Sequence, residues 1–308
     1  MNVLFISSGN SKYGISPIVY NQGLSLQNAG VNLSYFTIKG KGITGYLKNI
    51  FKLHKLLNQK QYDLFHAHYS ASSFAASLAG ARPLIVSLMG SDVKAGKHAK
   101  LLLMIFNKLF WKRCIVKSAD MKRSLGIKSA NVIPNGIDFN KFKKIIKEEA
   151  IKRIGWDKNK KYIVFASDPG RYEKNYKLAK VAFQSLNYNS LELKHLIDIP
   201  HDEMPYIYSA ADVVLCTSLW EGSSNVIKEA MACNCPIVTT DVGDVNEVIG
   251  NTDGSYICSY DPLDVAKKLD NAIRFGKRTL GRNSIKHLDQ EIIAKKVVKL
   301  YQDALKSK

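Results

Sequence analysis

Short apolar runs alternate with amphipathic segments along most of the chain. Short apolar runs are typical of buried strands, and segments with apolar residues at helical spacing predict helices that cover a sheet. The pattern predicts strands at 2–7, 31–38, 63–66, 84–88, 114–117 and 131–134, and again at 162–166, 191–195, 213–216, 236–238 and 255–258. Because helices are predicted between these strands, we expect an α/β fold with two doubly wound, Rossmann-like domains.

The intervals between the strands carry the helical patterns. Ser16 and Pro17 begin a helix that ends before Gly30, because proline favours the first helical turn and glycine the end. A last helix is predicted at 284–304. Residues 141–160 are polar and lysine-rich, with a short helix near 145–153, and they predict a linker between the two domains.

Length and composition agree with two soluble domains. The chain has 308 residues, of which 46% are hydrophobic and 23% charged, enough for two sizeable cores. No apolar run reaches the length of a membrane span, and the first residues lack the basic leader of a signal peptide. The five cysteines are odd in number and mostly in apolar surroundings, so we expect reduced thiols in a cytosol.

Positive charge gathers in the first part of the chain. Residues 1–140 hold 18 basic and 4 acidic side chains, a net +14 of the total +19. This imbalance predicts an anionic partner, which could be nucleic acid, a membrane surface or an acidic substrate. Residues 39–60 and 97–111 mix apolar residues with lysines, which predicts helices at a membrane surface. The alternative is that these helices pack on a core and only their wet face is basic.

Two carboxylates mark the strongest candidate site. Glu221 lies in a polar loop, and Glu229 follows eight positions later on a predicted helix. Eight positions make about 2.2 helical turns, so both carboxylates are predicted to face one pocket. Backbone N–H groups between them would bind an anion, and they belong to Ser223, Ser224 and Asn225. The arrangement suits a ligand with hydroxyls and phosphates, although two solvated surface acids are the ordinary alternative.

Two cations follow the strand predicted at 162–166. Arg171 and Lys174 lie near the start of the next helix, where positive charge is disfavoured, so they indicate a bound anion. The loop from Gly9 to Gly14 also follows a strand. It lacks the Lys-Ser or Lys-Thr of a P-loop and the spacing of a dinucleotide fingerprint, which argues against an NTPase and a dehydrogenase.

Two histidines end the strand predicted at 63–66. His66 and His68 could face a site, but histidines in a core or on a surface are commoner. A metal site would need a third ligand, and none is evident nearby, so no metal is expected.

Residues 221–250, EGSSNVIKEAMACNCPIVTTDVGDVNEVIG, resemble the Glu-x7-Glu signature of the retaining glycosyltransferases of family 4, which have the GT-B architecture. Residues 134–138, PNGID, are similar to a motif that usually ends the first domain of that family. Residues 89–92, MGSD, resemble the family's His-Gly-(Ser/Thr)-Asp, with Met89 where histidine is usual. The resemblance is dense from 160 to 260 and thinner from 1 to 140.

The resemblance implies two domains that face a cleft, with residues 1–140 on the acceptor side and 141–284 binding a nucleotide sugar. A last helix, about 285–308, would pack back on the first domain. The implied reaction moves a sugar from a nucleotide-diphosphate donor to a hydroxyl with retention, without a metal or further cofactor. The implied roles are diphosphate binding by Arg171 and Lys174, ribose binding by Glu229, sugar binding by Glu221, contact with the phosphate or acceptor at Gly14, and contact with the base at Ile197.

The implied activity and the basic first domain together predict a cytoplasmic enzyme that is peripheral on the inner face of a membrane. Its acceptor would be a lipid-linked or oligosaccharide precursor of a cell-envelope polysaccharide. Two alternatives stay open, a nucleotide-sugar epimerase on the same scaffold and a basic nucleic-acid-binding protein. No nucleic-acid recognition module is evident in the sequence, so nucleic acid is not the expected partner.

Overall fold

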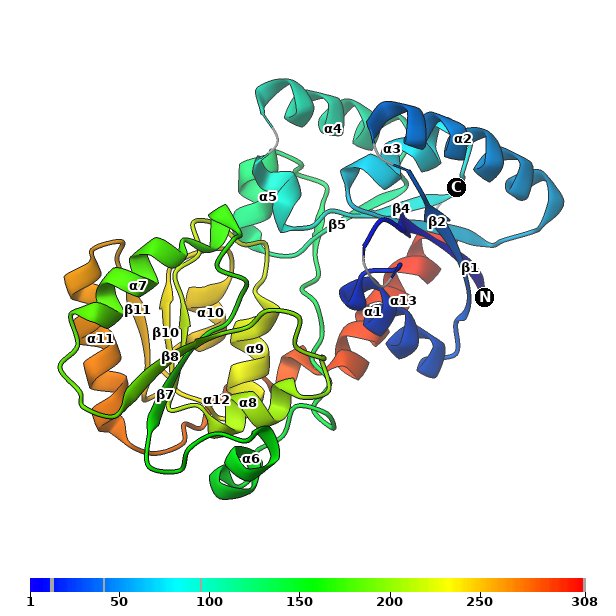
Figure 1. Cartoon of the computed structure of the whole chain (residues 1–308). Coiled ribbons are helices and arrows are strands. Elements are labelled where there is room, and N and C mark those ends of the chain that lie inside the picture. The colour runs from blue at the N-terminus through cyan, green and yellow to red at the C-terminus, as the bar shows by residue number, and fades with distance from the viewer. Residues whose placement is uncertain (12–13, 41, 95, 307–308) are drawn as a thin grey trace. The chain divides into compact units, whose positions relative to one another are not determined.

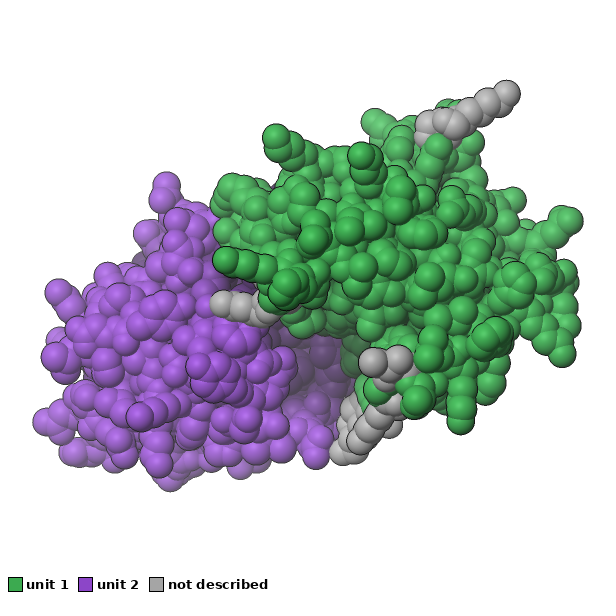
Figure 2. Space-filling view, turned by 90° about the horizontal axis from the view of Figure 1, so that it is seen from above, with its two compact units in different colours: residues 1–136, 290–308 green, residues 137–289 purple. Residues whose placement is uncertain are grey.

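The chain divides into two compact units in a computed structural model. The structure describes residues 1–11, 14–40, 42–94 and 96–306. Unit 1 consists of Met1–Gly136 with Gln290–Lys308, and unit 2 is Ile137–Asp289, as Figure 2 shows by colour. The predicted domain boundary at 140/141 lies within a few residues of the boundary after Gly136.

Unit 1 is built on a six-stranded parallel sheet (Figure 1). Its strands are β1 (Asn2–Ser8), β2 (Asn32–Ile38), β3 (Leu64–His68), β4 (Leu84–Ser87), β5 (Arg113–Val116) and β6 (Asn131–Val132), in the order β2-β1-β3-β4-β5-β6. The sequence predicted all six. Strand β1 pairs with β2 on one side and β3 on the other, so the strand order reverses between β1 and β3.

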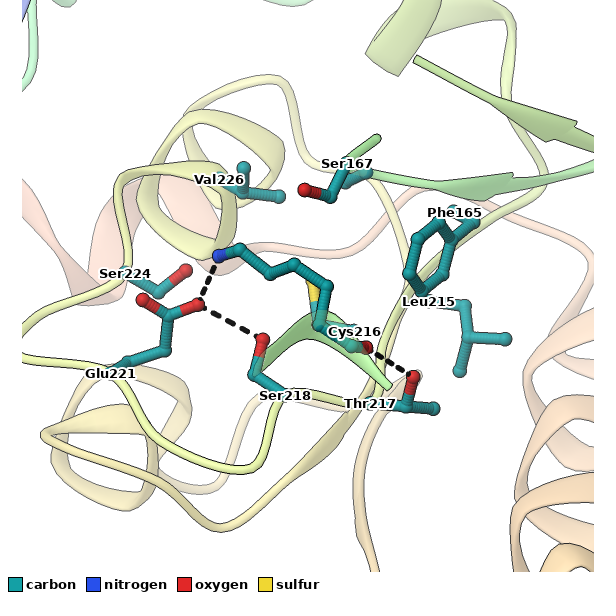
Figure 3. A pocket seen from close by; sticks show the side chains of 11 residues that line it. Phe165, Ser167, Leu215, Cys216, Thr217, Ser218, Glu221, Ser224 and Val226 are labelled. Atoms are coloured by element: carbon teal, nitrogen blue, oxygen red, sulfur yellow. Dashed lines mark hydrogen bonds and ion pairs between the residues drawn. The ribbon is translucent and has the colours of Figure 1, made fainter. Parts of the chain in front are cut away.

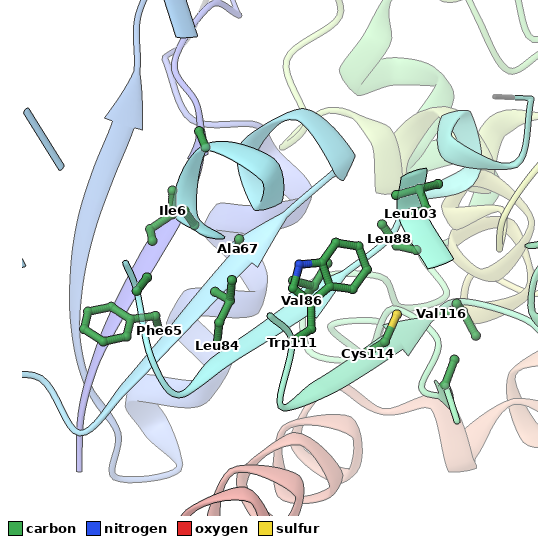
Figure 4. Packing of buried hydrophobic residues seen from close by; sticks show 14 of the residues in the cluster. Ile6, Phe65, Ala67, Leu84, Val86, Leu88, Leu103, Trp111, Cys114 and Val116 are labelled. Atoms are coloured by element: carbon green, nitrogen blue, oxygen red, sulfur yellow. The ribbon is translucent and has the colours of Figure 1, made fainter. Parts of the chain in front are cut away.

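Helices cover both faces of this sheet. They are α1 (Pro17–Asn28), α2 (Gly42–Gln59), α3 (Ser70–Leu78), α4 (Lys97–Leu109), α5 (Ala119–Leu125) and α13 (Gln290–Lys306), with a short 3-10 helix at Gly90–Lys94. Leu53 of α2, Ala75 of α3 and Leu103 of α4 join alternate strand residues in one core cluster, part of which appears in Figure 4. On the other face, Tyr301 of α13 contacts His66, and α13 packs against α1.

Unit 2 has a five-stranded parallel sheet in the order β11-β10-β9-β7-β8. The strands are β7 (Lys161–Phe165), β8 (Leu191–His195), β9 (Val213–Cys216), β10 (Ile237–Thr240) and β11 (Ser255–Cys258). The helices are α6 (Lys147–Ile154), α7 (Tyr176–Gln184), α8 (Met204–Ala210), α9 (Asn225–Ala232), α10 (Val245–Ile249), α11 (Pro262–Phe275) and α12 (Gly281–Ser284). The chain passes from β7 to β8 on one side and then to β9 on the other, so the order reverses between β7 and β9.

The last helix predicted at 284–304 is confirmed from Gln290 onward, but its predicted start at residue 284 is wrong. Helix α12 ends at Ser284, a 3-10 turn spans Lys286–Leu288, and Asp289 is extended, with φ −52° and ψ 136°. Helix α13 then begins at Gln290 and belongs to unit 1. A Cβ atom on Gly136 would lie 2.5 Å from the Cα of Gln290, so the close approach of the chain at these positions requires glycine.

Two further observations complete the fold. Helix α5 was not predicted; it begins where the Ser118 hydroxyl accepts a hydrogen bond from the Met121 N–H at 3.1 Å. No helix in the described ranges is both long and apolar enough to cross a membrane.

Candidate active site

A small pocket lies at the carboxyl ends of β7 and β9 in unit 2 (Figure 3). The strand order reverses between these two strands, and open α/β sheets bind ligands at that position. Val226, the second residue of helix α9, lines the pocket. The lining residues are Phe165, Ala166, Ser167, Lys174, Leu215, Cys216, Thr217, Ser218, Glu221, Ser224 and Val226.

The loops that follow β7 and β9 are tied together by hydrogen bonds. The Thr217 hydroxyl donates to the backbone oxygens of Lys174 and Asn175, both at 3.0 Å. The Leu219 N–H donates to the backbone oxygen of Glu173 at 2.8 Å. Asn175 adopts φ 52°, a left-handed conformation that asparagine tolerates, and it turns the chain from a 3-10 helix (Tyr172–Lys174) into α7. These bonds hold Lys174 at the pocket.

Lys174 and Glu221 form the charged pair of the pocket. Lys174 Nζ lies 2.5 Å from Glu221 Oε1, and the two side chains are only 14% and 19% exposed. The Ser218 hydroxyl donates to the same oxygen at 2.9 Å. Both donors therefore converge on Glu221 Oε1 and fix the carboxylate beside the first turn of α9.

A buried lysine supports the start of α9. Lys228 has no exposed surface; it donates to the Ser223 hydroxyl, which in turn donates to Asp244 Oδ2 at 2.5 Å. Burial lowers the pKa of Lys228, and the Asp244 and Glu229 charges oppose that shift. Burial also raises the pKa of Asp244, and the Lys228 charge opposes this by lowering it. The network fixes the backbone that leads into Ser224, the residue before the helix.

The N-terminal turn of α9 therefore faces the site with fixed backbone groups. The first N–H groups of any helix have no acceptor within that helix, and they carry partial positive charge. Ser224 lines the pocket and makes no side-chain cap bond, and Asn225 is the first helical residue. An anion bound there would meet both these N–H groups and the ammonium of Lys174.

Glu229 lies deeper in unit 2, with 7% exposure. Its carboxylate accepts a hydrogen bond from the Tyr208 hydroxyl at 2.9 Å and lies 3.2 Å from His201 Nε2. Lys141 Nζ lies 2.9 Å from the other ring nitrogen of His201. Because an ammonium group only donates, His201 Nδ1 must accept, and the ring proton is on Nε2, facing Glu229. Burial, followed by the Glu229 charge, raises the pKa of Tyr208 far above its usual value.

Glu221 lies in a loop and Glu229 on a helix, as predicted, but the helical spacing that was used to place both on one face does not apply. Helix α9 begins at Asn225, so Glu221 lies in the preceding loop and helical spacing does not relate it to Glu229. Glu221 lines the pocket, whereas Glu229 is not among the residues that do.

Five other candidate residues are not among those that line this pocket: Arg171, Ile197, Ser223 and Asn225 in unit 2, and Gly14 in unit 1. The Arg171 side chain is 56% exposed and contacts Glu173, with Nε 2.8 Å and Nη2 2.5 Å from Oε1. Ile197 is 49% exposed; the neighbouring Leu196 N–H donates to the Ser167 oxygen at 3.3 Å, which ties that loop to the pocket.

Gly14 belongs to unit 1, in the loop that follows β1. Its φ is 77° and its N–H donates to the backbone oxygen of Ser11 at 3.0 Å. The loop follows the end of one of the two strands between which the order of the unit 1 sheet reverses. Residues 12 and 13 of the predicted glycine loop lie outside the described residues.

The two histidines and Met89 belong to the interior of unit 1. His66 and His68 lie inside β3 without exposed surface. His66 Nδ1 is 2.5 Å from the Tyr301 hydroxyl, and its Nε2 is 2.8 Å from the Ser87 hydroxyl. Met89 is 4% exposed, so its side chain packs in the interior, and its N–H donates to Asp92 at 2.6 Å.

Sequence patterns missed several of the residues that shape the site. Thr217 and Ser218 directly follow the strand at 213–216, and that position could have identified them. Lys228 is a charged residue within a run of buried helix positions. The remaining missed residues are His201, Tyr208 and Asp244, and no pattern singles them out.

Neither a metal cluster nor an activated thiol is found at the pocket. In the described part of the chain, no group of three or more His, Cys, Asp and Glu side chains could hold a metal ion. Cys216 lines the pocket, but burial raises the pKa of its thiol to about 12, so it stays protonated near neutral pH.

Two family models match most of the chain. Residues 149–274 match the model described as glycosyl transferases group 1, and residues 12–119 match the model described as glycosyl transferase 4-like. The two models fall in unit 2 and unit 1 respectively.

Curated relatives are also glycosyltransferases by name. The chain is 23% identical over 262 residues to the Escherichia coli UDP-Gal:alpha-D-GlcNAc-diphosphoundecaprenol alpha-1,3-galactosyltransferase. The match covers 71% of this chain and 68% of that enzyme. It is 26% identical over 216 residues to Bacillus subtilis TuaC, named for a role as a teichuronic acid biosynthesis glycosyltransferase. That match covers 61% of this chain and spans 55% of TuaC.

Solved structures share the fold. Sucrose-phosphate synthase from Thermosynechococcus elongatus superposes with a TM-score of 0.85 at 15% identity, over 100% of both chains. Anabaena HepE in complex with UDP-glucose superposes with a TM-score of 0.74 at 15% identity, over 98% of this chain and 100% of HepE. At these identities the likeness shows the fold alone.

Proposed function

This chain is a glycosyltransferase of the GT-B architecture, and we propose that it transfers a sugar from a nucleotide diphosphate to a hydroxyl of a lipid-linked or polysaccharide precursor, with retention at the anomeric carbon. One observation carries the proposal. The Lys174–Glu221 pair lies in the pocket where the unit 2 sheet order reverses, beside the start of α9. A cation next to a helix N-terminus is electrostatically favourable only with negative charge between them.

The donor diphosphate is the anion that this arrangement suits. In the structure, the Lys174 charge is balanced by Glu221 at 2.5 Å. A bound diphosphate would add negative charge near the N–H groups of Ser224 and Asn225, and an ammonium group has three donors to share. Arg171 would supply a second cation once its guanidinium leaves Glu173. These groups would stabilise the charge that develops on the leaving diphosphate.

Two carboxylates and a loop would hold the rest of the donor. Glu221 would accept hydrogen bonds from sugar hydroxyls, and Glu229 from ribose hydroxyls. Each carboxylate oxygen accepts more than one hydrogen bond, so Glu229 keeps this capacity beside Tyr208 and His201. Ile197, on the loop tied to Ser167, would pack against the base.

The proposed transfer needs no nucleophilic carboxylate, because every bond broken and every proton moved is accounted for by the donor and the acceptor. The bond between the anomeric carbon and the diphosphate oxygen breaks while the acceptor oxygen bonds to the same face of that carbon. The proton of the acceptor hydroxyl passes to the departing diphosphate oxygen. Lys174 and Arg171 provide the positive charge at the leaving group, so we propose a reaction without a metal.

Acceptor and location follow from the relatives and from the charge. The names of the Escherichia coli and Bacillus subtilis relatives refer to a diphosphoundecaprenol-linked sugar and to teichuronic acid biosynthesis. Unit 1 contains most of the net positive charge of the chain, which is favourable near anionic lipids. We propose a cytoplasmic enzyme that is peripheral on the inner face of a membrane, with Gly14 near the phosphate or the acceptor.

A thermal-shift panel tests donor binding. Wild type and Glu229→Ala are heated with UDP-, GDP-, ADP- and dTDP-sugars. Stabilisation by one donor, lost in the variant, is expected, and it would identify the nucleotide. No shift with any donor, with or without a lipid-linked acceptor, would contradict the proposal.

Product analysis separates the alternatives. With the identified donor and an undecaprenyl-linked acceptor, we expect a glycosidic bond of the same anomeric configuration as the donor, formed also in excess EDTA. An inverted product would contradict retention, and loss of activity in EDTA would contradict metal independence. Conversion of the donor without an acceptor would indicate an epimerase. Salt-sensitive binding of DNA or RNA without donor binding would indicate a nucleic-acid-binding protein.

A further inference from the structure

Helix α4 exposes most of its apolar side chains. Leu103 is its one buried residue among those described, whereas five large apolar side chains are 42–59% exposed. These are Leu101, Leu102, Met104, Ile105 and Leu109. Residues four apart on a helix lie on one face, so Leu101, Ile105 and Leu109 form a row, and Leu103 points the other way. The outer face of a helix on a soluble domain is normally polar, so this row indicates a partner.

Positive charge surrounds this row. Lys97, Lys100 and Lys108 lie on α4, and Lys112 follows it. The sequence has no acidic residue between Asp92 and Asp120. The partner of α4 must therefore be apolar where it meets the row and negatively charged around it.

A groove at the end of α4 gathers three cations. Arg82, Lys108 and Lys112 line it together with apolar side chains that include Leu109, Phe110 and Leu305. It is an open groove with a volume of about 590 Å³. The Arg82 guanidinium lies 5.3 Å from the centre of the Phe110 ring, a distance that favours a cation–π contact.

The groove lies at the amino ends of the unit 1 strands. Leu84, the first residue of β4, lines it, and the Lys112 N–H donates to the Leu84 oxygen at 2.8 Å. The loop of Gly14 follows the carboxyl end of β1 instead, and all strands of the sheet run parallel. The groove is therefore at the opposite edge of the sheet from the glycine loop, and it is separate from the sugar-transfer site proposed above.

We propose that α4 and this groove bind an anionic phospholipid bilayer. The groove takes the phosphate of one lipid, and Leu101, Ile105 and Leu109 enter the boundary between headgroups and acyl chains. The inference deepens the membrane location proposed above and rests on it, but it needs no assumption about the donor sugar.

Charge complementarity argues against a second copy of the chain or a nucleic acid as the partner of α4 and the groove. In a symmetric dimer the same surface patch meets itself, so two copies of α4 would bring their lysines together. Nucleic acid would satisfy the cations but leave the row of leucine and isoleucine side chains without an apolar partner. An anionic bilayer satisfies both at once.

Helix α2 is also basic but is packed differently. Leu53 and Asn49 are buried, and Ile50, Leu56 and Leu57 pack against the core. Among its described side chains, Leu47 and Phe51 are the large apolar residues that are mainly exposed. For α2, the core-packed alternative of the sequence analysis describes most of the helix, and α4 is the principal membrane contact.

Vesicle flotation of the full chain tests the inference. The vesicles are phosphatidylcholine alone, or phosphatidylcholine with phosphatidylglycerol, at low and high salt. The groove variant is Arg82→Gln/Lys108→Gln/Lys112→Gln, and the apolar variant is Leu101→Ser/Ile105→Ser/Leu109→Ser. The controls are in unit 2: the triple variant Lys152→Gln/Lys158→Gln/Lys267→Gln for the groove, and the double variant Leu263→Ser/Leu280→Ser for the apolar row.

Wild type should bind the anionic vesicles, and high salt should weaken binding. Each removed cation should weaken binding about fivefold, so the groove variant should bind ~100-fold more weakly. The apolar variant should bind ~10-fold more weakly than wild type. Both control variants should bind like wild type.

Three results would overturn the inference. They are equal binding of wild type to both vesicle types, unchanged binding of the groove variant, and a dimer in light scattering that the apolar variant dissociates. Donor-induced thermal shifts are measured on the same preparations. A donor-induced thermal shift without vesicle binding would overturn this inference and leave the transferase proposal standing. Vesicle binding without a donor-induced thermal shift would support this inference and contradict the transferase proposal.

Discussion

Lys174 Nζ lies 2.5 Å from Glu221 Oε1, although the two residues are 47 positions apart in the chain. The pair links the loop after β7 to the loop after β9, and the Thr217 hydroxyl links the same loops through backbone oxygens. The ammonium is therefore held at the pocket before any donor binds. Because catalysis gains most from groups that need no reorganisation, this pair is the centre of the proposed site.

Replacing Lys174 with methionine should lower kcat by about 100- to 1,000-fold, the usual loss when one preorganised group at a developing negative charge is removed. Lys174→Arg should restore part of the rate, because it keeps the charge. The measurement is kcat and KM with the identified donor. Lys180→Met, at an exposed position on α7, is the control and should behave like wild type. A kcat of Lys174→Met within twofold of wild type would remove Lys174 from the mechanism.

Removing Arg171 should cost less than removing Lys174. The Arg171 side chain is 56% exposed and its guanidinium contacts Glu173 outside the pocket, so the donor must draw it away. We expect Arg171→Ala to lower kcat/KM about tenfold or less, and Glu173→Gln to raise donor affinity slightly. Titration of the donor against each variant measures both effects. A loss in Arg171→Ala as large as in Lys174→Met would mean that the loop rearranges to bring Arg171 to the phosphates.

The sequence predicted strands more accurately than it predicted the C-terminal helix. Strands β8, β9 and β11 have the predicted bounds: β9 is a continuous apolar run, and β8 alternates apolar and polar residues. At the C-terminus the apolar spacing continues across a break. Ile285 and Leu288 are buried in unit 2, whereas Ile293 and Val297 are buried in unit 1. Periodicity detects that a residue is buried, but it does not tell which of two cores receives it.

The candidate site was predicted as separate residues and not as a network. Lys174 and Glu221 each had a local signal, but their contact depends on bonds between two loops. Lys228 is a charged side chain with no exposure, and its burial depends on Ser223 and Asp244. Such tertiary compensation has no pattern along the chain, so sequence periodicity could not reveal it.

The buried Lys228–Ser223–Asp244 network should stabilise unit 2 as a unit. Lys228→Met leaves a buried carboxylate, and Asp244→Asn leaves a buried ammonium; each should lower the free energy of unfolding by about 3–5 kcal/mol. The double variant should lose clearly less than the sum, because neither charge is left unpaired. Denaturant unfolding of the four proteins gives the coupling free energy. Additive losses would show that the two residues act independently.

Substitutions at Tyr208 and Glu229 should have different effects, the first on the free energy of unfolding and the second on the donor KM. Tyr208→Phe removes a hydroxyl that donates to Glu229 at 2.9 Å, so it should lower the free energy of unfolding by about 1–2 kcal/mol. Its donor KM should change little, because the carboxylate remains. Glu229→Gln should raise the donor KM by about tenfold or more, since a neutral amide accepts ribose hydroxyl bonds more weakly. Equal donor KM values for Glu229→Gln and wild type would exclude Glu229 from the ribose site.

Unit 1 should lose stability in acid through His68. Its imidazole has no exposed surface, and among the described residues neither ring nitrogen has a hydrogen-bond partner. Burial, followed by the Lys117 charge, lowers the pKa of His68 from 6.5 to about 3. Between these two values the unfolded chain binds a proton that the folded chain does not, so the free energy of unfolding falls as pH decreases.

A shift of this size corresponds to about 5 kcal/mol at the acid end, at 1.36 kcal/mol per pKa unit. The pKa of His66 is also well below its usual value, first through burial, and acts in the same direction. His68→Phe should therefore show a shallower loss of stability between neutral pH and about pH 4 than wild type does. His54→Phe, at an exposed histidine on α2, is the control and should keep the wild-type slope. The measurement is the free energy of unfolding against pH for the three proteins. If His68→Phe kept the full wild-type slope, the acid sensitivity would have to come from other groups, since protonation of His68 in the unfolded chain could no longer contribute.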